Sequence, residues 1–153
     1  MRLVRTSFAF EEATAYIAHA GSNSLIESYF VQYLLVAFYS EVEERVKEII
    51  SQRLNEISDR KVASFIFKSN EAMLRRVKKA EINDVLHKFD CGDGDIISHL
   101  LGDMNLQPYF DAITNRHMVS HRDGVNMTLD DFSKALPCAE AILDALELAL
   151  AND

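Results

Sequence analysis

The scarcity of chain breakers is the feature that most constrains how this sequence can fold. The 153 residues include only 5 Gly and 2 Pro, so few turns are encoded in the chain. Apolar residues recur at helical spacing between these breakers, which favours helices over strands. The longest such run, about residues 24–56, exceeds the usual helix length. We therefore expect an all-α, single-domain helical bundle of about five to seven helices, with a long second helix as its spine.

Capping residues and apolar periodicity together predict where the helices begin and end. Helices are expected at about residues 8–20, 24–56, 96–101, 108–121, 128–136 and 137–150. The last boundary rests on Pro137, which is suited to the first turn of a helix. The first half of the long helix is apolar nearly all round and should be buried. Segment 59–69 fits a helix or a strand, and segment 71–89 fits one helix or two.

Length and cysteine content predict one cytoplasmic domain over residues 1–153. The chain is long enough to bury a core without disulfides. Cys91 and Cys138 form no zinc-binding spacing and suggest a reducing compartment. No long apolar run follows the first ten residues, so no secretory signal is expected. The most apolar stretch, residues 29–39, is about half as long as a membrane-spanning helix, and no membrane association is expected.

The charge distribution is uneven along the chain. The net charge is −8, which disfavours bulk nucleic-acid binding. Segment 60–88, however, holds eight basic residues against three acidic ones, a net +5 that leaves −13 for the rest. Such a run is most often a solvated helix face, but it also suits a cationic strip that attracts RNA or an acidic partner. Candidate RNA-binding residues are Arg75, Arg76, Lys78, Lys79 and, further along, Arg122.

Candidate catalytic groups gather near the end of the helix predicted at 108–121. His117 and His121 lie on one helix face, one turn apart, and Arg116 lies on the adjoining stripe. Two such helices facing each other would bring two arginines and four histidines into one cleft. Asn115, next to Arg116, has a side chain that can orient a histidine or a phosphate by hydrogen bonding.

These groups suit RNA cleavage by the 2′-hydroxyl. The reaction needs a base for the 2′-OH proton and an acid for the leaving 5′-oxygen, and histidine serves both roles near neutral pH. It also needs a cation on the phosphate, which the rigid, permanently charged guanidinium of arginine supplies. No metal and no other cofactor is required. An arginine this close before a histidine also arises by chance, as a surface ion pair beside an ordinary helix histidine.

Two segments resemble the HEPN superfamily, in particular its RiboL-PSP-like branch. The first runs from Asn115-Arg116-His117 to His121 and matches the family's arginine, polar residue and later histidine. The second, residues 37–50, resembles the family's long second helix, whose glutamate matches Glu43, with Glu41 as the alternative. The similarity in helix pattern covers roughly residues 8–150.

This resemblance implies a homodimeric helical bundle with metal-independent endoribonuclease activity. It assigns catalytic roles to Arg116 and His121 and makes His117 the polar residue after the arginine. The arginine and histidine motifs of two protomers would form one cleft. Toxin–antitoxin, phage-defence and RNA-processing settings are implied, with RNA and an antitoxin or other partner protein as binding partners.

Two alternatives remain open. The first is a non-catalytic helical protein-interaction module, the partner of a toxin–antitoxin or nucleotidyltransferase system, which the acidic residues between 41 and 48 and the net charge allow. The second alternative is a zinc site at His117 and His121. It is disfavoured because Met118 stands where the H-E-x-x-H motif has glutamate, and no third ligand is evident. No metal site is therefore expected.

Overall fold

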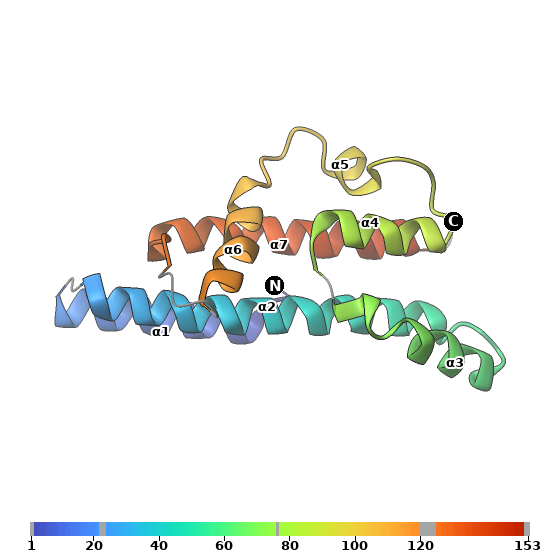
Figure 1. Ribbon diagram of the computed structural model, residues 1–153, viewed down its shortest axis with the longest axis horizontal. Coiled ribbons are helices and arrows are strands. Elements are labelled where there is room, and N and C mark those ends of the chain that lie inside the picture. The colour runs from blue at the N-terminus through green and yellow to red at the C-terminus, as the bar shows by residue number, and fades with distance from the viewer. Residues whose placement is uncertain (1, 22–23, 76, 120–124, 152–153) are drawn as a thin grey trace. The chain divides into compact units, whose positions relative to one another are not determined.

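The structure, a computed structural model, describes residues 2–21, 24–75, 77–119 and 125–151. Within these ranges it contains seven α-helices, one 3₁₀ helix and no strand (Figure 1). The helices are α1 (Val4–Ala20), α2 (Ser24–Leu54), α3 (Arg60–Asn70), η1 (Met73–Arg75), α4 (Lys79–Lys88), α5 (Ile96–Leu101), α6 (Gln107–Val119) and α7 (Leu129–Leu150). The predicted all-α class, the helix count and the long second helix are confirmed.

The chain divides into two compact units. The first unit comprises residues 1–41 and 105–140, and the second comprises residues 42–104 and 141–153. Each unit contains a part of α2 and a part of α7. One domain over residues 1–153 stays a prediction, and the two units are described separately below.

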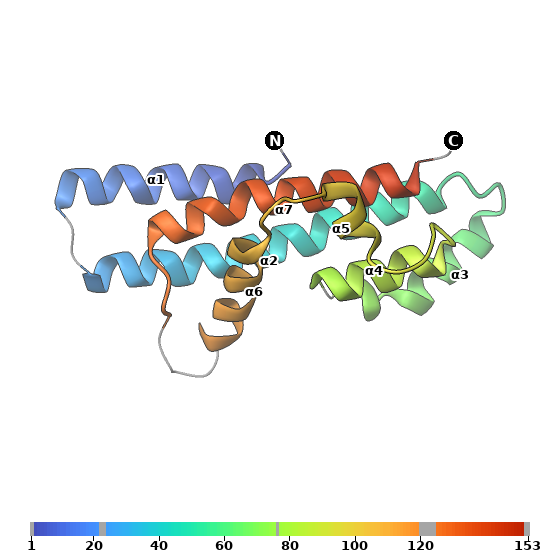
Figure 2. The ribbon, with the colours of Figure 1, turned by 90° about the horizontal axis from the view of Figure 1, so that it is seen from above.

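The first unit is built around buried aromatic rings. Phe38, Tyr109 and Phe132 come from α2, α6 and α7, and all three are fully buried. The ring of Phe38 meets Tyr109 at 6.0 Å and Phe132 at 5.7 Å between centroids, both edge to face. Such pairs stabilise a core beyond the burial of their area. In Figure 2, α1 and the first part of α2 run in opposite directions, and α6 runs at a steep angle to both.

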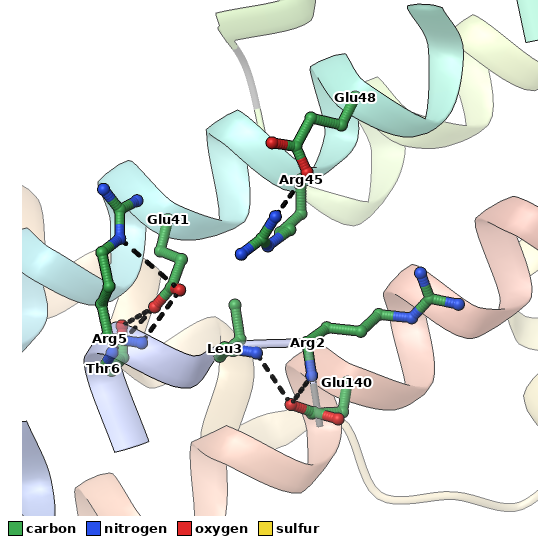
Figure 3. Close-up of polar contacts among 8 residues, drawn as sticks. All are labelled: Arg2, Leu3, Arg5, Thr6, Glu41, Arg45, Glu48 and Glu140. Carbon is green, nitrogen blue, oxygen red and sulfur yellow. Dashed lines mark hydrogen bonds and ion pairs between the residues drawn. The ribbon is translucent and has the colours of Figure 1, made fainter. Parts of the chain in front are cut away.

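The start of α1 is capped by carboxylates from distant parts of the chain. Leu3 precedes the helix and offers no side-chain cap. Glu140 accepts hydrogen bonds from the amides of Arg2 and Leu3, at 2.6 and 3.0 Å (Figure 3). Glu41 accepts three more, from the Arg5 amide at 3.1 Å, the Thr6 amide at 2.8 Å and the Thr6 hydroxyl at 2.7 Å. Because amides at a helix start lack intrahelical partners, these contacts allow α1 to begin before the predicted residue 8.

The helices of the second unit are capped by residues adjacent to them in sequence. Asp59 accepts from the amides of Lys61 and Val62 at the start of α3. Asp95 accepts from the Ser98 amide at the start of α5, which packs against α4. Both residues are good N-caps. Segment 59–69 is thus helical, and segment 71–89 divides into η1 and α4.

Two detailed predictions are wrong. Pro137 opens no new helix but lies inside α7. Proline removes one intrahelical hydrogen bond, yet buried Phe132, Ala135 and Ala139 form one continuous stripe past it, and their packing outweighs that loss. The first half of α2 is also not buried all round, as described below. Among the described helices, none has the length and apolar character needed to span a bilayer.

Candidate functional site

Arg116 and His117 meet the same aromatic ring. Both lie in the last turn of α6, and Tyr39 lies on α2 within the same unit. The guanidinium carbon of Arg116 is 4.7 Å from the centroid of the Tyr39 ring, which is a cation–π distance. The His117 ring meets Tyr39 edge to face, with centroids 6.1 Å apart. Tyr39 therefore holds the arginine and the adjacent histidine on one half-exposed surface.

One atom of Arg116 has no hydrogen-bond partner within the described part of the chain. Its Nε is buried, and no acceptor reaches it among the residues that the structure describes. Buried polar atoms without a partner are rare, and each needs an explanation such as a bound ion or ligand. The guanidinium carbon lies over the Tyr39 ring, and this contact positions a charged group whose Nε has no acceptor among the described residues. Arginine guanidinium groups bind anions with more than one oxygen, such as phosphates, through paired hydrogen bonds.

The side chain of Asn115 is occupied by local contacts. Its amide donates to the Asp111 carbonyl at 3.0 Å and its oxygen accepts from the Asn126 amide at 3.2 Å. Asn115 thereby joins α6 to the segment that precedes α7. It also lines a largely polar hollow of about 350 Å³, together with Asp111 and Lys134 among others. Orientation of a histidine or a phosphate by Asn115 stays a prediction.

His121 and Arg122, predicted as catalytic and RNA-binding residues, lie in segment 120–124, outside the described residues. The same holds for Arg76 of the basic segment. Their roles stay predictions. Among the residues that the structure does describe, no three His, Cys, Asp or Glu side chains gather as metal ligands would.

The two candidate glutamates of α2 have different environments. Glu43 belongs to the second unit, is half-buried and forms an ion pair with Lys47 at 2.6 Å. Glu41 belongs to the first unit, is fully buried and caps α1. Burial raises the pKa of Glu41, but the hydrogen bonds from Thr6 and Arg5 and the positive charge of Arg5 outweigh burial and lower the pKa overall. Glu41 is therefore an ionised structural residue, and a catalytic role for Glu43 stays a prediction.

The basic segment is partly neutralised by nearby acids. Arg75 pairs with Glu71 at 3.1 Å, and the Lys79 ammonium contacts Asp95 and the Ser98 hydroxyl. Burial raises the pKa of Asp95, but its contacts with Lys79, Ser98 and Asn83 lower it overall. Lys78 is exposed at the start of α4. Of the described candidates, Arg75 and Lys79 thus have acidic neighbours, and RNA binding by this segment stays a prediction.

Part of α2 exposes an apolar face, although the apolar pattern of this part predicts burial all round. Four of its side chains are 47 to 63% exposed: Leu25, Tyr29, Tyr33 and Val36. They recur every three or four residues and so share one face, which we call the α2 apolar face. The opposite face carries the fully buried Leu34 and Phe38. Exposed apolar patches of this kind mark interaction surfaces.

A match to a family model shows the family to which the chain belongs. The RiboL-PSP-HEPN family model matches residues 5–152, nearly the whole sequence. The chain therefore belongs to the RiboL-PSP-HEPN family, as the two resembling segments predicted. No curated protein and no solved structure matched it.

Sequence reasoning missed the contribution of Tyr39. The tyrosine stands two residues before Glu41, in the segment that resembles the family's second helix, but it was not recognised as a site residue. Its position at the edge of an apolar run was the available signal. Its contact with Arg116 joins residues 77 positions apart, which no local periodicity predicts.

Proposed function

We propose that this protein is a metal-independent endoribonuclease in which Arg116 binds the scissile phosphate. The observation that carries the proposal is the buried Nε of Arg116, which has no partner among the described residues and belongs to a guanidinium held over Tyr39 beside His117. An arginine fixed in this way needs little reorganisation to bind an anion, which favours stabilisation of developing charge. Membership of the RiboL-PSP-HEPN family supports the same type of activity.

The proposed reaction is an internal transesterification. A histidine, His121 or His117, takes the proton from the ribose 2′-hydroxyl, and the 2′-oxygen attacks the adjacent phosphorus. Arg116 stabilises the charge on the non-bridging oxygens. The bond between phosphorus and the 5′-oxygen breaks, and a second histidine protonates that oxygen. The products are a 2′,3′-cyclic phosphate and a free 5′-hydroxyl.

We propose that a second copy of the chain completes the site through the α2 apolar face. Tyr39 is on the same helix, three residues beyond Val36, so the face adjoins the surface that carries Arg116. A two-fold axis through this face would place the same uncharged side chains against each other, as isologous interfaces require. Two copies would also bring two arginines and four histidines to one cleft, from which the base and the acid of the reaction could be drawn.

RNA cleavage tests the proposal directly. Purified protein should cleave single-stranded RNA with EDTA present and leave 2′,3′-cyclic phosphate ends. Arg116→Lys keeps the charge but loses the planar fork, and it should reduce the cleavage rate by at least about a hundredfold. Arg53→Lys, at an arginine outside the site, is the matched control and should cleave normally. His121→Ala should abolish cleavage, whereas His99→Ala on α5 should not.

The dimer is tested separately by sedimentation. Tyr33→Glu on the α2 apolar face should shift the protein towards monomer and lower cleavage in parallel. Cleavage that needs a divalent metal, or that survives both Arg116→Lys and His121→Ala, would refute the nuclease. A protein partner that copurifies in fixed ratio, with no RNA cleavage at any concentration, would instead favour the non-catalytic interaction module.

The setting that fits this proposal is a cytoplasmic toxin or defence effector, as the family resemblance implies. Expression should then arrest growth, and Arg116→Lys should relieve the arrest at equal protein level. An antitoxin or other partner protein would then control the activity.

A further inference from the structure

The second unit contains a cavity that the proposed nuclease does not use. Its volume is about 310 Å³, and α2, α3, η1 and α4 all contribute to its wall. Nine of its eleven lining residues are apolar, among them Leu54, Phe67, Leu74 and Val85. Leu54, Leu74 and Val85 are buried core residues, so the wall is part of the folded structure of this unit.

Two polar side chains interrupt this apolar lining. Asn70 donates one hydrogen bond to the Ile66 carbonyl at 2.8 Å, which leaves its carbonyl oxygen as an acceptor. Lys88 is exposed at the end of α4, and its ammonium makes no hydrogen bond or ion pair with the residues that the structure describes. Apolar pockets of about 300 Å³ or more with a few polar groups are typical of small-molecule sites.

We infer that this cavity binds small amphipathic carboxylates, with the apolar body inside it and the carboxylate at the Lys88 ammonium. The charge at Lys88 selects an anion, and the apolar wall selects a hydrocarbon body. A cavity of about 150 Å³ accommodates benzene, so one of twice that volume suits a body of about twelve non-hydrogen atoms. Decanoate has this size and this chemistry.

Titration calorimetry with decanoate and decan-1-ol on the full chain tests the inference. Decanoate should bind at one site per chain. Lys88→Gln should weaken decanoate about two- to fivefold, as expected for an exposed ion pair, and leave decan-1-ol unchanged. Lys68→Gln, at an exposed lysine of α3 that does not line the cavity, is the matched control and should change neither affinity.

A second variant fills the cavity. Ile66 lines it, and Ile66→Trp should weaken both ligands at least tenfold, whereas Phe65→Trp, at the exposed neighbouring position, should not. Thermal melts of each variant establish that it is folded. The inference is overturned if the wild-type protein binds neither ligand saturably, if Ile66→Trp binds as well as wild type, or if Lys88→Gln weakens both ligands equally. RNA cleavage is not part of this readout, so failure here leaves the nuclease proposal intact.

Discussion

The start of α1, in the first unit, is stabilised differently from the starts of α3 and α5, in the second unit. In the second unit, α3 and α5 begin at Asp59 and Asp95, each of which accepts hydrogen bonds from amides two or three positions further on. In the first unit, α1 begins after Leu3, and its amides are satisfied by Glu41 and Glu140, 35 to 138 positions away. A local cap forms together with its helix, whereas a distant cap requires the tertiary structure. We therefore expect the start of α1 to depend on the folded core, and those of α3 and α5 to depend mainly on their own sequence.

Removal of the distant cap should have the largest effect. Glu41→Ala leaves two amides and a hydroxyl without acceptors in a buried position, and it should lower the free energy of unfolding by about 2–4 kcal/mol. Chemical denaturation measures the loss. Glu48→Ala, at an exposed and ion-paired glutamate of α2, is the control and should cost less than about 1 kcal/mol. Equal losses in the two variants would contradict the distinction between the two kinds of cap.

The same carboxylate should make stability depend on acid. The pKa of Glu41 in the folded chain is below its ordinary value of 4.5, so its contribution is complete above that pH and is lost as the pH falls through the lowered pKa. In Glu41→Gln, the free energy of unfolding should therefore fall less steeply than in wild type below about pH 4.5. Urea denaturation at several pH values tests this, and parallel pH profiles for the two proteins would argue against it.

Removal of a local cap should have the smallest effect. Asp59→Ala should cost about 1 kcal/mol, because one N-cap is lost and the exposed amides can bind water. The change should be confined to α3, so hydrogen exchange should accelerate at Lys61 and Val62 but not in α1. Asp84→Ala, at an exposed aspartate of α4, provides the baseline. Faster exchange at Arg5 and Thr6 in Asp59→Ala would show that the two kinds of cap are not independent.

The same distinction accounts for what the sequence predicted about the fold. Helices with local signals were placed closely: α5 follows Asp95, α1 ends at Gly21, and Thr128 and Asp131 cap each other through side chain and amide at the start of α7. The early start of α1 and the continuity of α7 through Pro137 were not predicted, because both depend on contacts with residues distant in sequence.

For the candidate site, the sequence placed Arg116, His117 and Asn115 together on one helix. It did not predict Tyr39 beneath Arg116, or the exposure of one face in the first half of α2. An apolar helix face has the same periodicity whether it packs against its own chain or against another molecule. Sequence pattern alone therefore could not separate the buried face at Leu34 and Phe38 from the exposed one at Tyr29 and Tyr33.

The α2 apolar face has a consequence for how nuclease activity depends on the amount of protein. If nuclease activity requires two chains to meet through Leu25, Tyr29, Tyr33 and Val36, the number of working sites in dilute solution rises with the square of the protein level. A small amount of protein would then be almost inert, and a modest increase in synthesis would have a disproportionate effect on RNA. Control over how much of the chain accumulates would be sufficient to keep it harmless.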